Sequence, residues 1–318
     1  MKRKMEVSEL IFKIVAYFFL IVFALMCVYP FIYAISSAFS SQAANSNGEV
    51  VLWPVDPTID AFAWAFTNSQ FWISYSNTIF MTFLGTIWSL FYSILGAYAL
   101  SKKRIMGRRG WNFFLVFTMW FSAGVVATYA NYRDTANIFA AIFGTAGEGS
   151  TTLPMYSIDL KWVVVIAMGM NATNIILLRN AFEGVPAEIE EAARIDGATE
   201  MQVLTKVYLP MSKATIATVA LFFGISRWNG YFWAMRIMGT QQQYSWPVQV
   251  YLRNFIESYT SFITPYDVEA NPWPYDSTLS MEGCAYAIVV CSVIPILIIY
   301  PFIQKYFAKG VNMGGVKE

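Results

Sequence analysis

This sequence has few charged residues and no histidine. Asp, Glu, Lys and Arg together make up 13% of its 318 residues, whereas a typical soluble domain carries about 25%. Because so few charges cannot cover a protein surface in water, an ordinary soluble domain is excluded. Histidine is absent, which removes the commonest general base and the commonest metal ligand. We therefore expect no metal and no cofactor.

Cysteine is scarce as well, and its positions indicate no disulfide framework. Cys27, Cys284 and Cys291 all lie in apolar runs. We interpret them there as small hydrophobic residues of helices rather than as a thiol site. The net charge of +1 is too small to indicate a class of partner, and no nucleic acid is expected among the partners.

Hydrophobic residues, at 57% of the chain, are gathered into runs long enough to cross a bilayer. A membrane-spanning helix needs about 20 mostly apolar residues. The first run stays apolar for too long to be a cleaved signal peptide. We predict an all-α membrane protein with a single domain, 1–318, and six transmembrane helices, at about 12–39, 73–100, 111–130, 161–179, 213–235 and 283–305.

The distribution of Lys and Arg predicts the orientation of these spans. Of the 21 basic residues, 16 lie near the N-terminus, after the second span, between spans four and five, and in the C-terminal tail. Loops rich in Lys and Arg remain in the cytoplasm, so both termini are predicted to be cytoplasmic. The five basic residues outside these segments are Arg133, Lys161, Arg227, Arg236 and Arg253.

Residues 186–210 are charged and helix-forming, unlike the apolar segments on either side. Pro186 fits the first turn of a helix, and Gly197 is placed to end that helix with a left-handed turn. Thr199 and Gln202 then form the capping box of a second helix, which Pro210 is expected to end. The segment therefore predicts a cytoplasmic helix–turn–helix.

Apolar residues of this segment follow helical spacing. Ile189, Ala192 and Ala193 form a narrow stripe on the first helix, and Met201, Leu204 and Tyr208 are the predicted buried face of the second. Small residues allow another surface to approach closely, and the carboxylates beside them can pair with basic groups. On spacing alone, an ordinary amphipathic surface helix is the alternative.

Eight positions of this segment resemble the EAA loop of ATP-binding cassette (ABC) importer permeases. They are Glu191-Ala192-Ala193, Asp196-Gly197-Ala198 and Leu209-Pro210. Residues 174–182, the pair Trp228-Asn229 and the segment from Tyr300 onward are similar to the carbohydrate-uptake branch of that family, so the resemblance covers nearly the whole chain. The outside loops, 131–161 and 236–282, are longer than is usual there.

The resemblance implies a type I ABC importer permease architecture, with 181–212 as a coupling loop between spans four and five. It implies a bacterial cytoplasmic membrane, a second permease forming a heterodimer, two cytoplasmic ATPase subunits, an extracellular or periplasmic solute-binding protein and a saccharide substrate. The chain itself is not expected to be an enzyme, since it lacks the phosphate-binding G-x-x-x-x-G-K-[ST]. The implied ATPase-coupling residues are Glu190, Glu191, Ala192, Ala193, Asp196, Gly197, Ala198, Leu209 and Pro210.

Arg227 is an unusual charge within the fifth predicted span. An intramembrane charge normally faces protein or a water-filled cavity, although an arginine near a helix end can also extend to the lipid headgroups. Trp228, Asn229 and Tyr231 lie beside it, and aromatic rings with polar donors suit sugar rings. We expect these residues to line a saccharide pathway, and contact with Arg227 would favour an acidic saccharide.

Asn171 and Asn174 in the fourth span are candidates for the same pathway. Span amides more commonly bond neighbouring helices, and that interpretation stays open. Three other functions also stay open: an ABC permease for another solute class, a membrane-embedded transferase and a secondary transporter. A transferase would need clustered acids or histidines, and a secondary transporter often uses buried carboxylates. No Asp or Glu lies in a predicted span.

Overall fold

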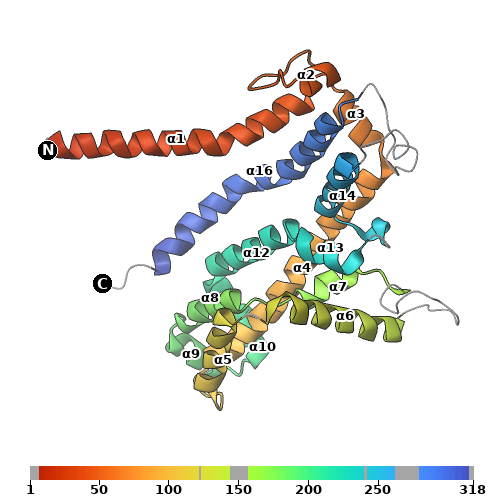
Figure 1. Ribbon diagram of the computed structural model, residues 1–318. Helices are drawn as coiled ribbons and strands as arrows, with labels where there is room; N and C mark the ends of the chain where they lie inside the picture. Colours follow the sequence, from red (N-terminus) through yellow and green to blue (C-terminus); the bar gives the residue numbers. More distant parts are fainter. Residues whose placement is uncertain (1–6, 122, 144–156, 240–241, 262–278, 315–318) are drawn as a thin grey trace. The chain divides into compact units, whose positions relative to one another are not determined.

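The structure is a computed structural model that describes residues 7–121, 123–143, 157–239, 242–261 and 279–314. All regular elements in these ranges are helices, which confirms the predicted all-α fold (Figure 1). The elements are α1 (Val7–Ala38), α2 (Gln42–Ser46), α3 (Asp60–Thr67), α4 (Ser69–Ser101), α5 (Arg108–Trp120), α6 (Gly124–Phe143), α7 (Lys161–Ala167), α8 (Ala172–Glu183), α9 (Ala187–Ile195), α10 (Glu200–Val203), the π-helix η2 (Leu204–Tyr208), α11 (Leu209–Met211), α12 (Lys213–Trp228), α13 (Tyr231–Met238), the 3-10 turn η3 (Gln243–Ser245), α14 (Val248–Ser261) and α16 (Met281–Gly314).

Three single helices in the described ranges are long and apolar enough to cross a membrane. They are Ser8–Ala38, Ser69–Ser101 and Met281–Pro301. Three further candidates are pairs of helices that meet at a bend, and with these the number of possible spans rises to six. The pairs are Arg108–Trp120 with Gly124–Phe143, Lys161–Ala167 with Ala172–Glu183, and Glu200–Met211 with Lys213–Trp228.

The predicted spans 111–130, 161–179 and 213–235 each fall on two helices. The fourth breaks between α7 and α8, which meet at 47°. A Cβ on Gly169 would lie 2.9 Å from the Ile166 carbonyl oxygen, so only glycine fits the break. The fifth breaks after Trp228, where α12 ends, and Gly230 allows a tight turn there because its Cβ position lies 3.0 Å from the Ser226 carbonyl oxygen.

The two predicted outside loops contain helices where the structure describes them. α6 lies partly in 131–161, while α13 and α14 lie within or beside 236–282. Residues 144–156, 240–241 and 262–278 of these loops are outside the described ranges.

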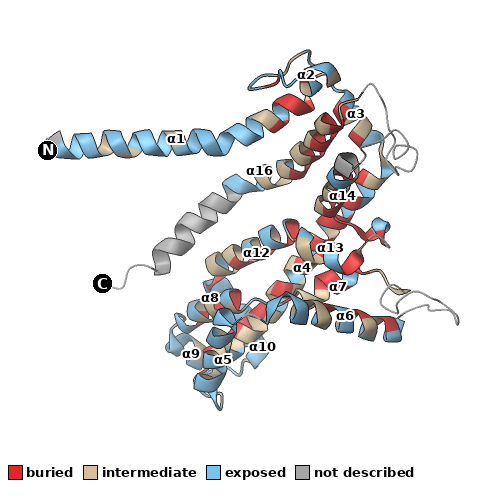
Figure 2. Ribbon diagram, viewed as in Figure 1, coloured by how far each residue is buried: buried red, intermediate tan, exposed pale blue. Residues whose placement is uncertain are grey.

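The chain divides into two compact units, and the first takes its residues from Met1–Ser69 and Leu252–Ile294. Most of α1 is exposed, and only its last turns are buried (Figure 2). There the side-chain amide of Asn45 donates to the Ser37 carbonyl at 3.0 Å, and the rings of Tyr33 and Tyr286 pack edge to face at 5.5 Å. An apolar helix so exposed within its own chain suits a lipid environment.

The second unit, Gln70–Tyr251 with Pro295–Glu318, is built around α4. One of its cores packs α4 against α6, α7 and α13, and contains Leu160, Val163 and Ile237. The other lies near the C-terminal end of α4, against α8, α10, η2 and α12, and contains Phe182 and Val203. Figure 1 shows α5, α8, α9 and α10 gathered at that end. These two cores position the two candidate sites described next.

Candidate functional site

The first candidate site is a helical elbow formed by α9, α10, η2 and α11, hereafter the coupling elbow. α9 begins after Pro186, which is its N-cap rather than its first helical residue. It ends at Gly197, whose φ of 81° is left-handed as predicted. The N–H of Gly197 donates to the Arg194 carbonyl and that of Ala198 to the Ala193 carbonyl, both at 3.0 Å. This is the Schellman arrangement, which satisfies the last carbonyls of the helix.

The second half of the elbow begins with the predicted capping box. The Thr199 N–H donates to Gln202 Oε1 at 2.8 Å, and the Gln202 N–H donates to Thr199 Oγ1 at 3.4 Å. Pro210 was expected to end this helix, and the helical path through η2 does end at Met211, one residue later. A proline ring normally clashes with the carbonyl four residues earlier. The wider π-turn just before Pro210 relieves that clash.

The outer face of the elbow exposes large apolar side chains. Ile195 is 86% exposed, Met201 59% and Ile189 42%. Met201 was predicted to be buried, but the position that faces the core is Val203, with Leu204 and Tyr208 buried as expected. Exposed apolar side chains grouped on a charged segment are typical of a protein-interaction surface.

The predicted coupling residues divide between the two faces of the elbow. Ala193, Ala198 and Leu209 pack partly against the second core. The outward residues are Glu191, Ala192, Asp196, Gly197 and Pro210. Glu190 alone among the acids of α9 turns inward, towards a buried polar cluster.

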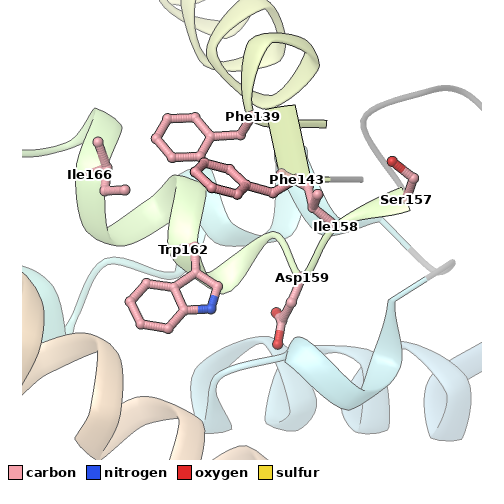
Figure 3. Close-up of a pocket in the computed structure, with 7 residues that line it drawn as sticks. All are labelled: Phe139, Phe143, Ser157, Ile158, Asp159, Trp162 and Ile166. Atoms are coloured by element: carbon pink, nitrogen blue, oxygen red, sulfur yellow. The ribbon is translucent and has the colours of Figure 1, made fainter. Parts of the chain in front are cut away.

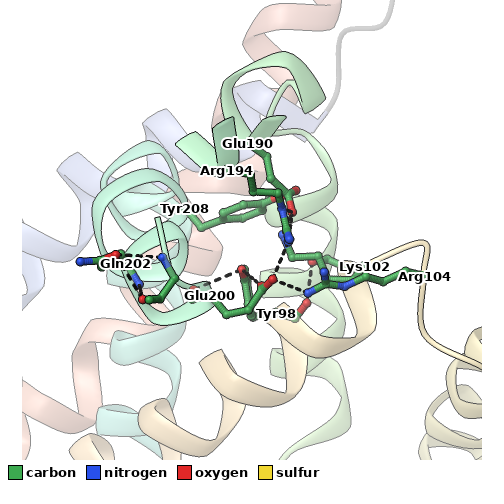
Figure 4. Close-up of polar contacts among 10 residues, drawn as sticks. Tyr98, Lys102, Arg104, Glu190, Arg194, Glu200, Gln202 and Tyr208 are labelled. Atoms are coloured by element: carbon green, nitrogen blue, oxygen red, sulfur yellow. Dashed lines mark hydrogen bonds and ion pairs between the residues drawn. The ribbon is translucent and has the colours of Figure 1, made fainter. Parts of the chain in front are cut away.

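Lys102 is the centre of this inner cluster, shown in Figure 4. It directly follows α4, and its side chain is 8% exposed. Its Nζ lies 2.7 Å from Glu190 Oε1, 4.3 Å from the ring centroid of Tyr98 and 4.0 Å from that of Tyr208. Tyr208 Oη also donates to Glu190 Oε2 at 2.5 Å. The two aromatic faces and the carboxylate offset part of the cost of burying the ammonium, although burial still lowers the pKa of Lys102.

Arginines and a second acid surround that cluster. Arg194 contacts Glu190 at 2.8 Å and Glu200 at 2.7 Å. Glu200 also pairs with Arg104 at 2.5 Å and accepts from Tyr98 Oη at 2.9 Å. Burial alone would raise the pKa of Glu190, but hydrogen bonds from Lys102, Tyr208 and Arg194 outweigh it and lower the pKa to about 2. Glu190 is therefore ionised at any physiological pH.

The second candidate site surrounds Arg227, in the last turn of α12. Its side chain is buried, and it faces the end of α7 rather than an acid. Nη1 donates to the Val164 carbonyl at 2.5 Å, and Nη2 donates to the Val165 carbonyl at 3.1 Å and to Ser89 Oγ at 2.9 Å. Carbonyls in the last turn of a helix have no intrahelical donors and carry partial negative charge. Arg227 thus supplies donors and charge where the fourth span is broken.

The other predicted pathway residues lie at or beside two helix breaks, the one between α7 and α8 and the one between α12 and α13. Asn171 is the N-cap of α8, and its Oδ1 accepts from the Asn174 N–H at 3.1 Å. Asn174 itself is buried. Trp228 ends α12 and packs edge to face with Tyr75 at 6.2 Å, and the exposed residues Asn229 and Tyr231 follow.

Two cavities lie in the part of the second unit that contains α7. The one beside Arg227 has a volume of about 10 Å³, which holds about one water molecule and no sugar ring. The other is an open cavity of about 460 Å³ (Figure 3). Its carboxylate, Asp159, is already engaged by Ser245 and Lys161. The open cavity is lined by Phe139, Phe143, Ser157, Ile158, Asp159, Trp162 and Ile166.

Comparison with known families shows which family this chain belongs to. Residues 3–313 match the family described as the binding-protein-dependent transport system inner membrane component. The chain belongs to this family. It is therefore a transport permease rather than an enzyme, and the family is consistent with a bacterial inner membrane.

Individual relatives resemble the permease over nearly its full length. It is 32% identical over 308 residues to the polygalacturonan/rhamnogalacturonan transport system permease protein YtcP of Bacillus subtilis, covering 96% of this chain and 98% of that protein. It is 32% identical over 290 residues to protein LplC of the same organism, covering 91% of this chain and 89% of LplC.

A solved structure agrees with the fold of the permease. A chain in the crystal structure of a bacterial ABC transporter involved in the import of the acidic polysaccharide alginate superposes with a TM-score of 0.80 at 41% identity. The match covers 96% of this chain and 100% of that chain. The helical fold of the permease is thus that of a type I ABC permease.

Sequence reasoning missed the inner cluster of the permease. The basic loop containing Lys102 and Arg104 was interpreted only as a signal of membrane orientation, and Tyr98 was read as part of an apolar span. One signal was present: a lysine directly after a span, followed by two further basic residues, lies opposite an acidic segment in the predicted topology. Charge complementarity between the two cytoplasmic segments would have suggested the contact.

Proposed function

We propose that the permease forms half of the translocation pathway of an ABC importer for an acidic oligosaccharide, in a bacterial cytoplasmic membrane. A second permease supplies the other half, two cytoplasmic ATPase subunits supply energy, and an extracellular or periplasmic binding protein delivers the substrate. ATP-driven closure of the ATPases moves both coupling elbows, and the pathway alternates between facing outward and facing inward.

In this proposal the chain has six spans, and both termini and the coupling elbow are cytoplasmic. The 16 basic residues gathered in four segments support that orientation. α9 and the start of α10 enter a cleft of the ATPase. Glu191, Ala192, Asp196 and Gly197 face the ATPase there, while Ala193, Ala198 and Leu209 hold the elbow on the permease and Pro210 stays exposed beside them.

The observation that carries this proposal is the exposed apolar surface of a firmly built elbow. Ile195 and Met201 are 86% and 59% exposed, although a Schellman turn and a capping box fix the backbone around them. Burying an isoleucine side chain contributes about 1.5–3 kcal/mol. A soluble partner that covers these side chains would therefore be bound favourably, and the exposed acids give it a charged rim.

The acidic class of saccharide rests on the relatives. Alginate is an acidic polysaccharide, and the chain of its importer is 41% identical to this permease. Polygalacturonan, named for the relative YtcP, is likewise a polymer of a sugar acid. A pathway for such substrates would pass Asn171, Asn174, Trp228, Asn229 and Tyr231. In this proposal Arg227 shapes the pathway by holding the broken fourth span, because its donors already bind carbonyls.

Purification and transport test the proposal together. The permease, tagged at one end, is purified from membranes of its own host, and the proteins that accompany it are identified. The complex is then placed in proteoliposomes with its binding protein, and uptake of labelled uronate oligosaccharides is compared with uptake of neutral ones of equal length. We expect ATP-dependent uptake that favours the uronates. ATP-dependent uptake of a non-saccharide only would refute the proposal and favour an ABC permease for another solute class.

A further inference from the structure

We propose that Lys102 is a positioning residue that transmits the movement of the coupling elbow to α4, through its ion pair with Glu190. The inference rests on the proposed function, since it concerns the same elbow, and it adds the route by which motion leaves the elbow. It concerns contacts within this chain and not those with an ATPase.

The geometry places one side chain at the junction of three elements. Lys102 follows the last residue of α4, Glu190 lies in the middle of α9, and Tyr208 ends the π-helix η2. The Nζ–Oε1 distance is 2.7 Å, and the Lys102 ammonium is 4.0 Å from the Tyr208 ring centroid. Any displacement of α9 or η2 relative to α4 must therefore change contacts of this one ammonium group.

Because the Lys102 and Glu190 side chains are largely buried, the contact between them is costly to break. The exposed fractions of the Lys102 and Glu190 side chains are 8% and 17%, and separating them leaves the buried Lys102 ammonium without its carboxylate, which is strongly unfavourable. Arg104 and Glu200 form the other ion pair between the same loop and the elbow, but these side chains are 57% and 45% exposed. Water can replace that contact at little cost. Of these two ion pairs, the one between Lys102 and Glu190 therefore transmits a displacement of the elbow to the end of α4.

Two adjacent acids of α9 have different partners in this arrangement. Successive residues of an α-helix point about 100° apart, and Glu190 faces the cluster whereas Glu191 is exposed. Glu190 receives contacts from Lys102, Arg194 and Tyr208, so it faces its own chain rather than another protein. Glu190 thus links the elbow to the membrane helix, and Glu191 remains available to the ATPase.

The decisive variant is Lys102→Met combined with Glu190→Gln. It removes both charges at once and leaves no buried ion unpaired, and such replacements usually leave stability unchanged. The amide that Glu190→Gln introduces can still accept from Arg194 through its oxygen, and its NH2 group can donate to the Tyr208 hydroxyl. The matched control is Arg104→Met, which removes the exposed pair between the same two segments and leaves the elbow itself unchanged. Lys102→Arg, which keeps the positive charge between the two rings, is the conservative variant.

Three quantities are measured on each complex: the amount of ATPase subunit that co-purifies, the unfolding midpoint, and the saccharide transported per ATP hydrolysed in proteoliposomes. For the double variant we expect unchanged ATPase binding and midpoint with about a tenfold fall in transport per ATP, within the range typical of coupling between sites. The control should transport as much saccharide per ATP as wild type does. Lys102→Arg should retain most of the wild-type value.

Wild-type transport per ATP in the double variant would overturn the inference. Loss of the ATPase subunit from the double variant would overturn it as well, because the cluster would then shape the docking surface instead of transmitting motion. A wild-type permease that carries no ATPase subunit would refute the proposed function and this inference with it. The wild-type arm therefore separates a failure of the proposed function from a failure of the role of Lys102.

Discussion

Arg227 donates a 2.5 Å hydrogen bond to the carbonyl oxygen of Val164, which lies 63 residues earlier in the chain. Together with its bonds to Val165 and Ser89, this contact holds α12 against the broken end of α7. Replacing the arginine by an apolar residue leaves buried carbonyls without a donor, and each lost bond to a charged group costs about 1.5–3 kcal/mol.

We therefore expect Arg227→Met to lower the free energy of unfolding by about 3 kcal/mol or more. The measurement is the unfolding midpoint of the purified permease complex. Arg236→Met is the matched control, since Arg236 is exposed and lies 5.6 Å over the ring of Phe232; its effect should stay within about 0.5 kcal/mol. Equal midpoints for the two variants would show that the carbonyl contacts do not stabilise the permease.

Gly85 provides the space that the Arg227 side chain occupies. A Cβ at position 85 would lie 3.1 Å from Nε of Arg227, so Gly85→Ala should cost about 1–3 kcal/mol through overpacking. In the Arg227→Met background the cost should shrink, because the flexible methionine can move aside. A double-mutant cycle on the unfolding midpoint measures this coupling. Strictly additive effects on the unfolding midpoint would mean that the side chains at positions 85 and 227 do not interact sterically.

Gly197 forms the left-handed turn between the two halves of the coupling elbow. No atom lies within 4 Å of its Cβ position, but its φ is 81°, so Gly197→Val should cost about 1–2 kcal/mol through backbone strain alone. Less ATPase subunit should then co-purify, because the exposed side chains of Ile195 and Met201 lie on either side of this turn and would change position relative to each other. Gly197→Asn, which tolerates this conformation, should retain most binding. Gly184→Ala is the control, since Gly184 has an ordinary φ of −77°.

Ile195 tests the docking surface separately from folding. It is 86% exposed, so Ile195→Asp should leave the unfolding midpoint unchanged while it weakens ATPase binding about tenfold or more, as at other interface anchors. Met106→Asp is the control, since Met106 is 91% exposed in the loop after α4. If both variants bind the ATPase like wild type, the partner uses another surface.

The pH dependence of the elbow follows from Glu190. Its pKa is lowered to about 2 in the folded protein from 4.5, so its ionisation favours folding above pH 4.5, and this contribution disappears as the pH falls towards 2. The difference in unfolding midpoint between wild type and Glu190→Gln should be constant from about pH 8 to about pH 5 and shrink at lower pH. A difference that grows on acidification would contradict the ion pair with Lys102.

Local rules predicted the local features of this permease correctly. The all-α fold, the left-handed turn at Gly197 and the Thr199–Gln202 capping box depend on residues within a few positions of each other, and all three are confirmed. The orientation in the membrane and the roles of the coupling residues stay predictions.

Features that depend on distant contacts were not predictable in the same way. Pro210 correctly marked the end of a helix to within one residue, but the π-helix Leu204–Tyr208 before it was not predicted. Met201 was placed on the buried face because spacing cannot tell which side of a short helix meets the core. The Arg227 guanidinium donates to carbonyls of a helix that lies about 60 residues earlier in the sequence. No local sequence pattern predicts a contact between residues so far apart.

The two caps of the coupling elbow have a consequence for partner recognition. The Schellman turn at Gly197 and the capping box at Thr199 already fix the backbone that follows Ile195, so little conformational entropy remains to be lost when a partner binds. Ordering a mobile interface side chain costs about 0.5–1.5 kcal/mol, and a flexible loop costs more. The permease thus offers its partner a rigid surface, and the affinity for that partner should be sensitive to small changes in the shape of this surface.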